Sequence, residues 1–149
     1  MKIYKASDVA EWFLARNNID FLEGCADMIT NLKLQKLLYY AQGCSLALTN
    51  HPLFKEDILA WTHGPVVREV YDIYKRYGGE GITYYGYYRN VFDNEHEDIL
   101  EQVYQTFGIY SAWGLRNMTH NESPWKETPI NCVISLDLIK DYFLENYCE

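Results

Sequence analysis

The chain has 149 residues, 48% of them hydrophobic, and a formal net charge of −8 at pH 7. This length supports one domain with a buried core and is too short for two well-packed domains, so we expect a single domain over residues 1–149. The negative charge argues against direct binding of nucleic acid, because phosphate neutralisation needs clustered Lys and Arg side chains.

The N-terminal residues contain no apolar run typical of a signal peptide, because charged side chains interrupt every short hydrophobic stretch. No segment approaches the roughly 20 apolar residues that a membrane-spanning helix needs. We therefore expect a cytoplasmic protein without membrane contacts. The four cysteines show neither CxxC pairing nor a histidine at metal-ligand spacing, so we expect reduced thiols and no metal site.

Two helices are predicted in the first third of the chain. Ser7 is the expected N-cap of the first helix, which ends near the turn-favouring residues 17–18. Thr30 is the expected N-cap of the second helix, which runs to about Leu48. Apolar residues recur in it at helical spacing and assign one face to the core, namely Leu34, Leu37, Leu38, Ala41 and Leu48. Lys33 and Lys36 are left for acidic neighbours such as Glu69 or Asp72, or for a partner.

The middle of the chain mixes extended and helical signals. Residues 58–61 predict a short strand or extended segment, and Gly64 with Pro65 predicts a loop that leads into a helix ending at Gly78. Residues 82–90 are rich in strand-forming residues around Gly86, which predicts a short hairpin or an irregular surface loop.

The last third of the chain is predicted to be helical and acidic. We expect helices over residues 95–107, capped by Asn94, over 111–118, and after Ser135, which is its cap, with a turn-rich loop over 119–129. The fold class is therefore mainly α, a single compact domain of about five to six helices. Residues 1–92 carry ten acidic and ten basic side chains, whereas residues 93–149 carry eleven acidic and three basic ones, so a basic partner is favoured there.

Seven of the fourteen tyrosines fall within residues 71–88. Neighbouring side chains of an extended segment face opposite ways, so Tyr84, Tyr85, Tyr87 and Tyr88 cannot all be buried together. Tyrosine offers a large contact area with few rotatable bonds and a polar tip, and it is enriched at recognition surfaces. We predict a partner-binding surface that includes these four tyrosines, Arg89, Lys33 and Lys36.

Four segments resemble the Panacea domain, also described as SocA-like or GepA-like, of bacterial and phage antitoxins. They are ITNLKLQKLLYYAQG over 29–43, PLF over 52–54, AWTHGPVVREVY over 60–71 and THNESPW over 119–125. The motif residues expected to be structural are Leu34, Gln35, Lys36, Leu37, Tyr39, Tyr40, Trp61, His63, Gly64, Pro65, Val66, His120, Pro124 and Trp125. The loop containing His120 and Trp125 is expected to fold back over the core, with the indole buried and its N–H bonded to a carbonyl.

This resemblance implies a mainly helical domain that neutralises a cognate toxin by direct binding, or an adaptor that delivers the toxin to a cellular protease. It specifies neither the toxin nor the oligomeric state. Many relatives carry a further domain, whereas this chain is expected to be the bare domain without a DNA-binding module. Relatives often have an aromatic residue after the YYAQG run, where this chain has Cys44 and Ser45.

Two other functions are consistent with the residues. A small hydrolase or metal-binding enzyme would use His63 with His120 or with an acidic residue such as Glu69, and a phage-encoded protein of this type would modulate its host. The sequence contains no glycine-rich phosphate loop, GxSxG or HExxH motif. We therefore expect a binding protein rather than an enzyme, with no cofactor and no bound metal.

Overall fold

The computed structural model describes residues 2–148. In this part of the chain there are seven α-helices, one 3-10 helix and one two-stranded antiparallel hairpin. In chain order they are α1 (Ala6–Leu22), α2 (Asn31–Thr49), β1 (Leu59–Trp61), β2 (Gly64–Val66), α3 (Arg68–Tyr74), η1 (Lys75–Tyr77), α4 (Asn94–Phe107), α5 (Ala112–His120), α6 (Ser123–Lys126) and α7 (Leu136–Asn146). The predicted mainly α fold is confirmed, and the short α6 is a helix beyond the number expected.

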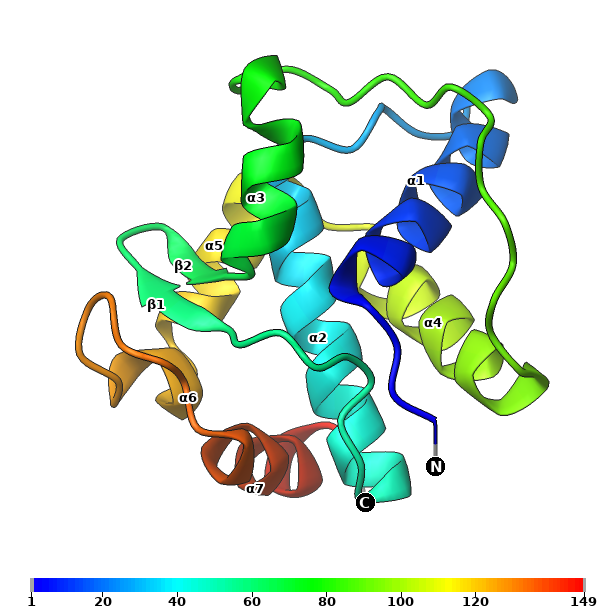
Figure 1. Cartoon of the computed structure of the whole chain (residues 1–149). Coiled ribbons are helices and arrows are strands. Elements are labelled where there is room, and N and C mark those ends of the chain that lie inside the picture. Colours follow the sequence, from blue (N-terminus) through cyan, green and yellow to red (C-terminus); the bar gives the residue numbers. More distant parts are fainter. Residues whose placement is uncertain (1, 149) are drawn as a thin grey trace.

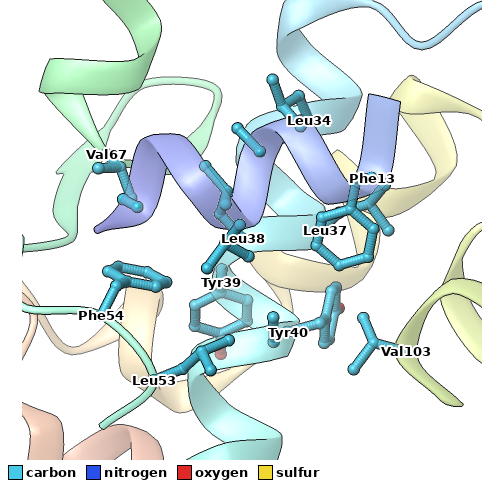
Figure 2. Close-up of a cluster of buried hydrophobic side chains, with 14 of the residues drawn as sticks. Phe13, Leu34, Leu37, Leu38, Tyr39, Tyr40, Leu53, Phe54, Val67 and Val103 are labelled. Carbon is cyan, nitrogen blue, oxygen red and sulfur yellow. The ribbon is translucent and has the colours of Figure 1, made fainter. Parts of the chain in front are cut away.

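Helix α2 lies at the centre of the molecule (Figure 1). It contacts α1, α3, α4, α5, α7 and β2, so most of the other elements pack against it. Figure 2 shows side chains of α2 such as Leu37 and Tyr40 packed among residues from other segments, including Phe13 and Val103. A helix surrounded in this way has no solvent face over most of its length, and its polar residues are buried as well.

The buried polar side chains of α2 hold the backbone of distant segments. Gln35 Oε1 accepts a hydrogen bond from Val67 N at 2.9 Å. Gln42 accepts from Leu53 N at 2.7 Å and donates to Phe54 O at 3.0 Å. A buried backbone group without a partner costs about 1–3 kcal/mol, so each of these bonds favours one path for the chain around α2.

Two of the predicted helix caps are confirmed, because Thr30 accepts a hydrogen bond from Lys33 N and Ser135 accepts from Leu138 N. Ser111, which was not predicted to be a cap, also accepts from Gly114 N. Each hydroxyl pairs with one of the amide groups that lack a partner inside the first helical turn. The starts of α2, α5 and α7 are therefore determined by local sequence.

Two predicted caps were wrong. Helix α1 begins at Ala6, and its amide is held by the Glu56 carboxylate at 3.0 Å, so a distant side chain replaces Ser7 as the cap. Helix α4 is capped by Asp93, which accepts from His96 N at 2.9 Å, and Asn94 is the first helical residue. Either residue satisfies the preference for a short polar side chain.

Helix α1 also continues to Leu22, beyond its predicted end at residues 17–18. Asn17 is buried and its side-chain amide donates to Tyr104 OH at 3.3 Å. Arg16 binds Glu101 at 2.9 Å, again across to α4. Contacts with α4 thus stabilise helical turns that the local sequence disfavours.

The segment around Gly64 and Pro65 corrects another prediction. The predicted loop leading into a helix is not formed here, because both residues lie in β2, where Pro65 pairs with Ala60 and Gly64 with Trp61. Helix α3 begins only at Arg68. Gly64 has φ +112°, a conformation that side-chain-bearing residues rarely adopt, and a Cβ there would lie 2.7 Å from Lys36 Cε. Close packing of the hairpin against α2 therefore requires glycine.

Two further predictions concern the loops. Residues 82–90 contain no β-strand and adopt the second predicted form, an irregular surface loop, which runs over the outer side of α1 towards α4 (Figure 1). Residues 119–129 are not all loop, because α5 extends to His120 and α6 follows with Pro124 in its first turn, where proline is tolerated. No helix within residues 2–148 has both the length and the apolar character needed to span a membrane.

Candidate functional site

The structure brings two of the motif segments together at one place. Trp125 Nε1 donates to the carbonyl of Trp61 at 2.8 Å, as predicted, although the indole is only half-buried. The His120 ring stacks on the Trp125 indole, with centroids 3.9 Å apart and planes 6° from parallel. These contacts connect the β hairpin to α5 and α6, so the two segments form one structural unit.

Two residues that sequence reasoning missed complete this unit. The Trp113 ring lies 6.1 Å from the His63 ring, and the Arg116 guanidinium lies 4.5 Å over the Trp113 ring. Trp113 is 54% exposed. The three-residue spacing of Trp113 and Arg116 on a helix was the signal that could have indicated their contact. We call Trp61, His63, Trp113, Arg116, His120 and Trp125 the motif cluster.

The motif cluster is aromatic and basic. Burial lowers the pKa of His120, and the neighbouring positive charges of Arg116 and Lys36 lower it further. Arg116 Nε and His120 Nε2 are both buried, and neither has a hydrogen-bond partner among the described residues. The motif cluster therefore contains basic side chains and no acidic one, although the protein as a whole is acidic.

The structure does not assemble the residues of the hydrolase alternative. His63 is exposed beside Trp113, whereas Glu69 lies in a different surface depression with Asp57, Arg68 and Asp72. Within residues 2–148, no group of three or more His, Cys, Asp or Glu side chains is arranged to hold a metal ion. The arrangement supports packing and recognition better than acid–base chemistry.

The predicted position of Lys36 was wrong. It was expected on the partner surface, but its side chain is fully buried and its Nζ donates to Pro65 O at 3.1 Å. Burial lowers its pKa to about 7. The alternative ion pair with Asp72 is not formed either, since Asp72 faces Arg68 and Lys75. Helical spacing did not reveal this, because the hairpin covers the face of α2 that carries Lys36.

Lys33 is half-buried, and its Nζ donates to Gly108 O at 2.6 Å. The other motif residues with an expected structural role are placed as follows: Leu34, Gln35, Leu37, Tyr39, Tyr40, Gly64, Pro65, Val66 and Pro124 are buried, Trp61, His120 and Trp125 are half-buried, and His63 is exposed. The described structure therefore divides the motif into a buried frame and a small accessible cluster.

Glu122 is a further feature that sequence reasoning missed. The residue is only 2% exposed. Its carboxylate accepts hydrogen bonds from Tyr39 OH at 2.8 Å, Tyr40 OH at 2.7 Å and Tyr147 OH at 2.5 Å. Burial raises its pKa even though the three hydroxyl donors oppose the rise. One carboxylate thereby ties α2, α6 and the end of α7 together.

The tyrosine-rich segment presents two kinds of side chain. Tyr84 and Tyr88 are half-buried against the core, whereas Tyr85 and Tyr87 are 62% and 84% exposed. The rings of the exposed pair stack, with centroids 6.4 Å apart. Arg89 is also exposed. Alternation along the segment thus produces an anchored side and an accessible side, a pattern consistent with a recognition surface.

Comparison with known proteins identifies related sequences. The model of the family described as "Antitoxin SocA-like, Panacea domain" matches residues 34–126, from α2 to α6. The chain is 33% identical over 109 residues to Antitoxin SocA of Caulobacter vibrioides (strain NA1000 / CB15N), an alignment that covers 65% of this chain and 58% of that protein. The chain thus spans a little over half the length of this relative. No solved structure matches.

Proposed function

Since the chain belongs to the family of SocA-like antitoxins with a Panacea domain, we propose that it neutralises a cognate protein toxin by binding it directly. The match of residues 34–126 to this family is the observation that carries the proposal. It is supported by the structure, in which the family motif forms a packing frame and the adjoining segment exposes large side chains.

We place the main toxin contact on the tyrosine-rich segment. Tyr85 and Tyr87 are among the most exposed aromatic side chains of the described residues, and Tyr84 and Tyr88 hold their backbone against the core. A rigidly anchored pair of aromatic rings loses little conformational entropy on binding, which favours affinity. Arg89 extends this surface as a hydrogen-bond donor, whereas Lys33 lines a separate depression with Gly108 and Tyr110.

We further propose that the toxin is basic on one face. Residues 93–149 hold eleven acidic side chains, and exposed ones lie along α4 and α7, including Glu95, Asp98, Asp137 and Asp141. Complementary charge accelerates association and is screened by salt. A basic toxin should therefore associate more slowly as the ionic strength rises.

The functional experiment uses the product of the adjacent gene as the candidate toxin. Growth is measured with that product expressed alone and together with this chain, and the affinity of the purified pair is measured by calorimetry. Rescue of growth together with a stable complex is expected. A harmless neighbour, with no other toxin rescued, would contradict the antitoxin function. Rescue that disappears in a host lacking the cellular protease would indicate an adaptor.

The contact surface is tested by replacing Tyr85 and Tyr87 with alanine. Aromatic hot-spot residues contribute about 2 kcal/mol or more, so toxin affinity should fall by at least about 30-fold. Tyr110→Ala is the matched control, because Tyr110 is exposed (42%) but lies in the α4–α5 connection. If the double variant has an unchanged circular dichroism spectrum and binds the toxin with unchanged affinity, the tyrosine segment is not the contact surface. That result would not contradict the antitoxin function.

A further inference from the structure

A cavity of about 420 Å³ lies between α2, the β hairpin, α3 and residues 130–131. Its wall on the α2 side is formed by Asn31, Gln35 and Lys36, and the hairpin contributes Trp61 and His63. Most of the lining is apolar, with a few polar groups that converge on it. This volume and composition are typical of sites that bind small organic molecules.

The buried polar wall of this cavity has spare hydrogen-bond donors. Asn31, Gln35 and Lys36 are at most 3% exposed. Asn31 Nδ2 donates to Tyr71 O at 3.2 Å, Gln35 Nε2 donates to Asn31 Oδ1 at 3.0 Å, and Lys36 Nζ donates to Pro65 O. An amide nitrogen carries two N–H groups and an ammonium carries three, so each of these groups retains at least one N–H without a bond among the described residues.

The charge around the cavity is also one-sided. None of the residues that line it is acidic, although the chain contains 21 Asp and Glu side chains. Lys36 and His63 are basic, and the charged side chain that acts on Lys36 from α5 is Arg116, which is basic as well. A buried amine with unused donors and no counter-ion is stabilised in its protonated form when an anion is placed beside it.

We propose that this cavity binds a small organic anion. Its carboxylate or phosphate group is directed to the wall of Asn31, Gln35 and Lys36, and its apolar body packs against Trp61 and Ile130. The binding of this ligand does not depend on the antitoxin function, because none of residues 83–88 lines the cavity.

The test uses the ¹⁵N-labelled chain and a matched set of probes. Benzoate and phenyl phosphate supply the anion, benzamide replaces the carboxylate with a neutral amide, and benzylamine carries a positive charge. The amide resonances of residues 61–63 and 130–131 should shift with benzoate and phenyl phosphate. Benzoate should bind at least about tenfold more tightly than benzamide, the scale of one charge-assisted hydrogen bond.

Two variants locate the site. Lys36→Met keeps the volume of the buried side chain but removes its charge, and should weaken benzoate binding by at least about tenfold. Lys33→Met is the matched control on the same helix, because Lys33 lies outside the cavity, and binding should be unchanged. Ile130→Trp fills the cavity from its exposed rim, where Ile130 is 49% exposed, and should abolish binding without altering the core.

The proposal is overturned if neither anion binds, if benzamide or benzylamine binds as tightly as benzoate, or if the shifts map away from residues 61–63 and 130–131. Unchanged benzoate binding by a folded Lys36→Met variant would also overturn it. Should that variant not fold, the Ile130→Trp variant decides, because benzoate binding that survives a filled cavity places the ligand elsewhere.

Discussion

At the scale of single residues, Glu122 has the largest structural role, although its local sequence does not predict that it is buried. Glu122 lies in a turn-rich segment, yet it is almost completely buried under three tyrosine hydroxyl groups. A buried carboxylate is costly unless hydrogen bonds replace its hydration, and here they come from two residues of α2 and one at the end of α7. Replacing it therefore affects packing that involves three helices.

The first prediction concerns Glu122→Gln. The free energy of unfolding should fall by about 1–3 kcal/mol, because a neutral amide is a weaker acceptor for the three hydroxyl groups. Glu127→Gln, an exposed change just beyond α6, should have almost no effect. Urea unfolding followed by circular dichroism measures both variants, and equal stabilities would contradict the proposed role.

Glu122 also gives a pH dependence of known sign. Its pKa in the folded protein is raised above the ordinary value of 4.5, so the folded state retains the proton more strongly than the unfolded state. This contribution to stability is fully present below pH 4.5 and is lost as the pH rises through the folded pKa. The stability difference between wild type and Glu122→Gln should change in that window, and the Glu127→Gln difference should not.

At the scale of elements, close packing between α2 and α7 depends on one glycine. A Cβ at Gly43 would collide with the ring of Phe143, which is fully buried. Glycine in a helix interior costs about 1 kcal/mol relative to alanine, so helix propensity alone favours replacing it. The steric conflict opposes this gain, and the balance between the two is measurable.

We predict that Gly43→Ala lowers the free energy of unfolding by about 1–3 kcal/mol, because overpacking exceeds the gain in helix propensity. In α5 the corresponding Gly114→Ala change meets Ser111 Oγ at 3.2 Å and Tyr110 Cβ at an ordinary 3.8 Å, and it should be neutral or stabilising. Combining Gly43→Ala with Phe143→Leu should restore part of the lost stability. A stabilised single variant in thermal unfolding would show that the helices separate at little cost.

At the scale of the whole molecule, the central position of α2 predicts a single cooperative unfolding transition. Six other elements contact this helix, and no part of the described core is separate from it. Circular dichroism and tryptophan fluorescence should therefore give coincident urea transitions. Two separate transitions would show that part of the molecule folds independently of α2.

The central position of α2 also predicts how much stability is lost when a side chain of this helix is truncated. Leu38→Ala removes a fully buried side chain and should cost about 2–5 kcal/mol while the two transitions remain coincident. Leu48 lies in the same helix but is 51% exposed, and Leu48→Ala should change stability by less than about 0.5 kcal/mol. Equal effects of the two changes would contradict the buried position of α2.

Local sequence determined much of the fold. Helical periodicity and two of the predicted caps identified the starts of α2 and α7, and the motif segments indicated the antitoxin family that the comparisons show. These features depend on neighbours within one or two turns, so the sequence contains the relevant interactions.

Only the tertiary structure decided where the polar motif residues lie. The β hairpin covers Lys36, contacts from distant helices bury Glu122, and packing on the core separates Tyr84 and Tyr88 from Tyr85 and Tyr87. Periodicity distinguishes one face of a helix from another, but whether a polar face is covered depends on segments far away in the chain. The cavity beside Lys36 arises in the same way, from three segments that the fold brings together.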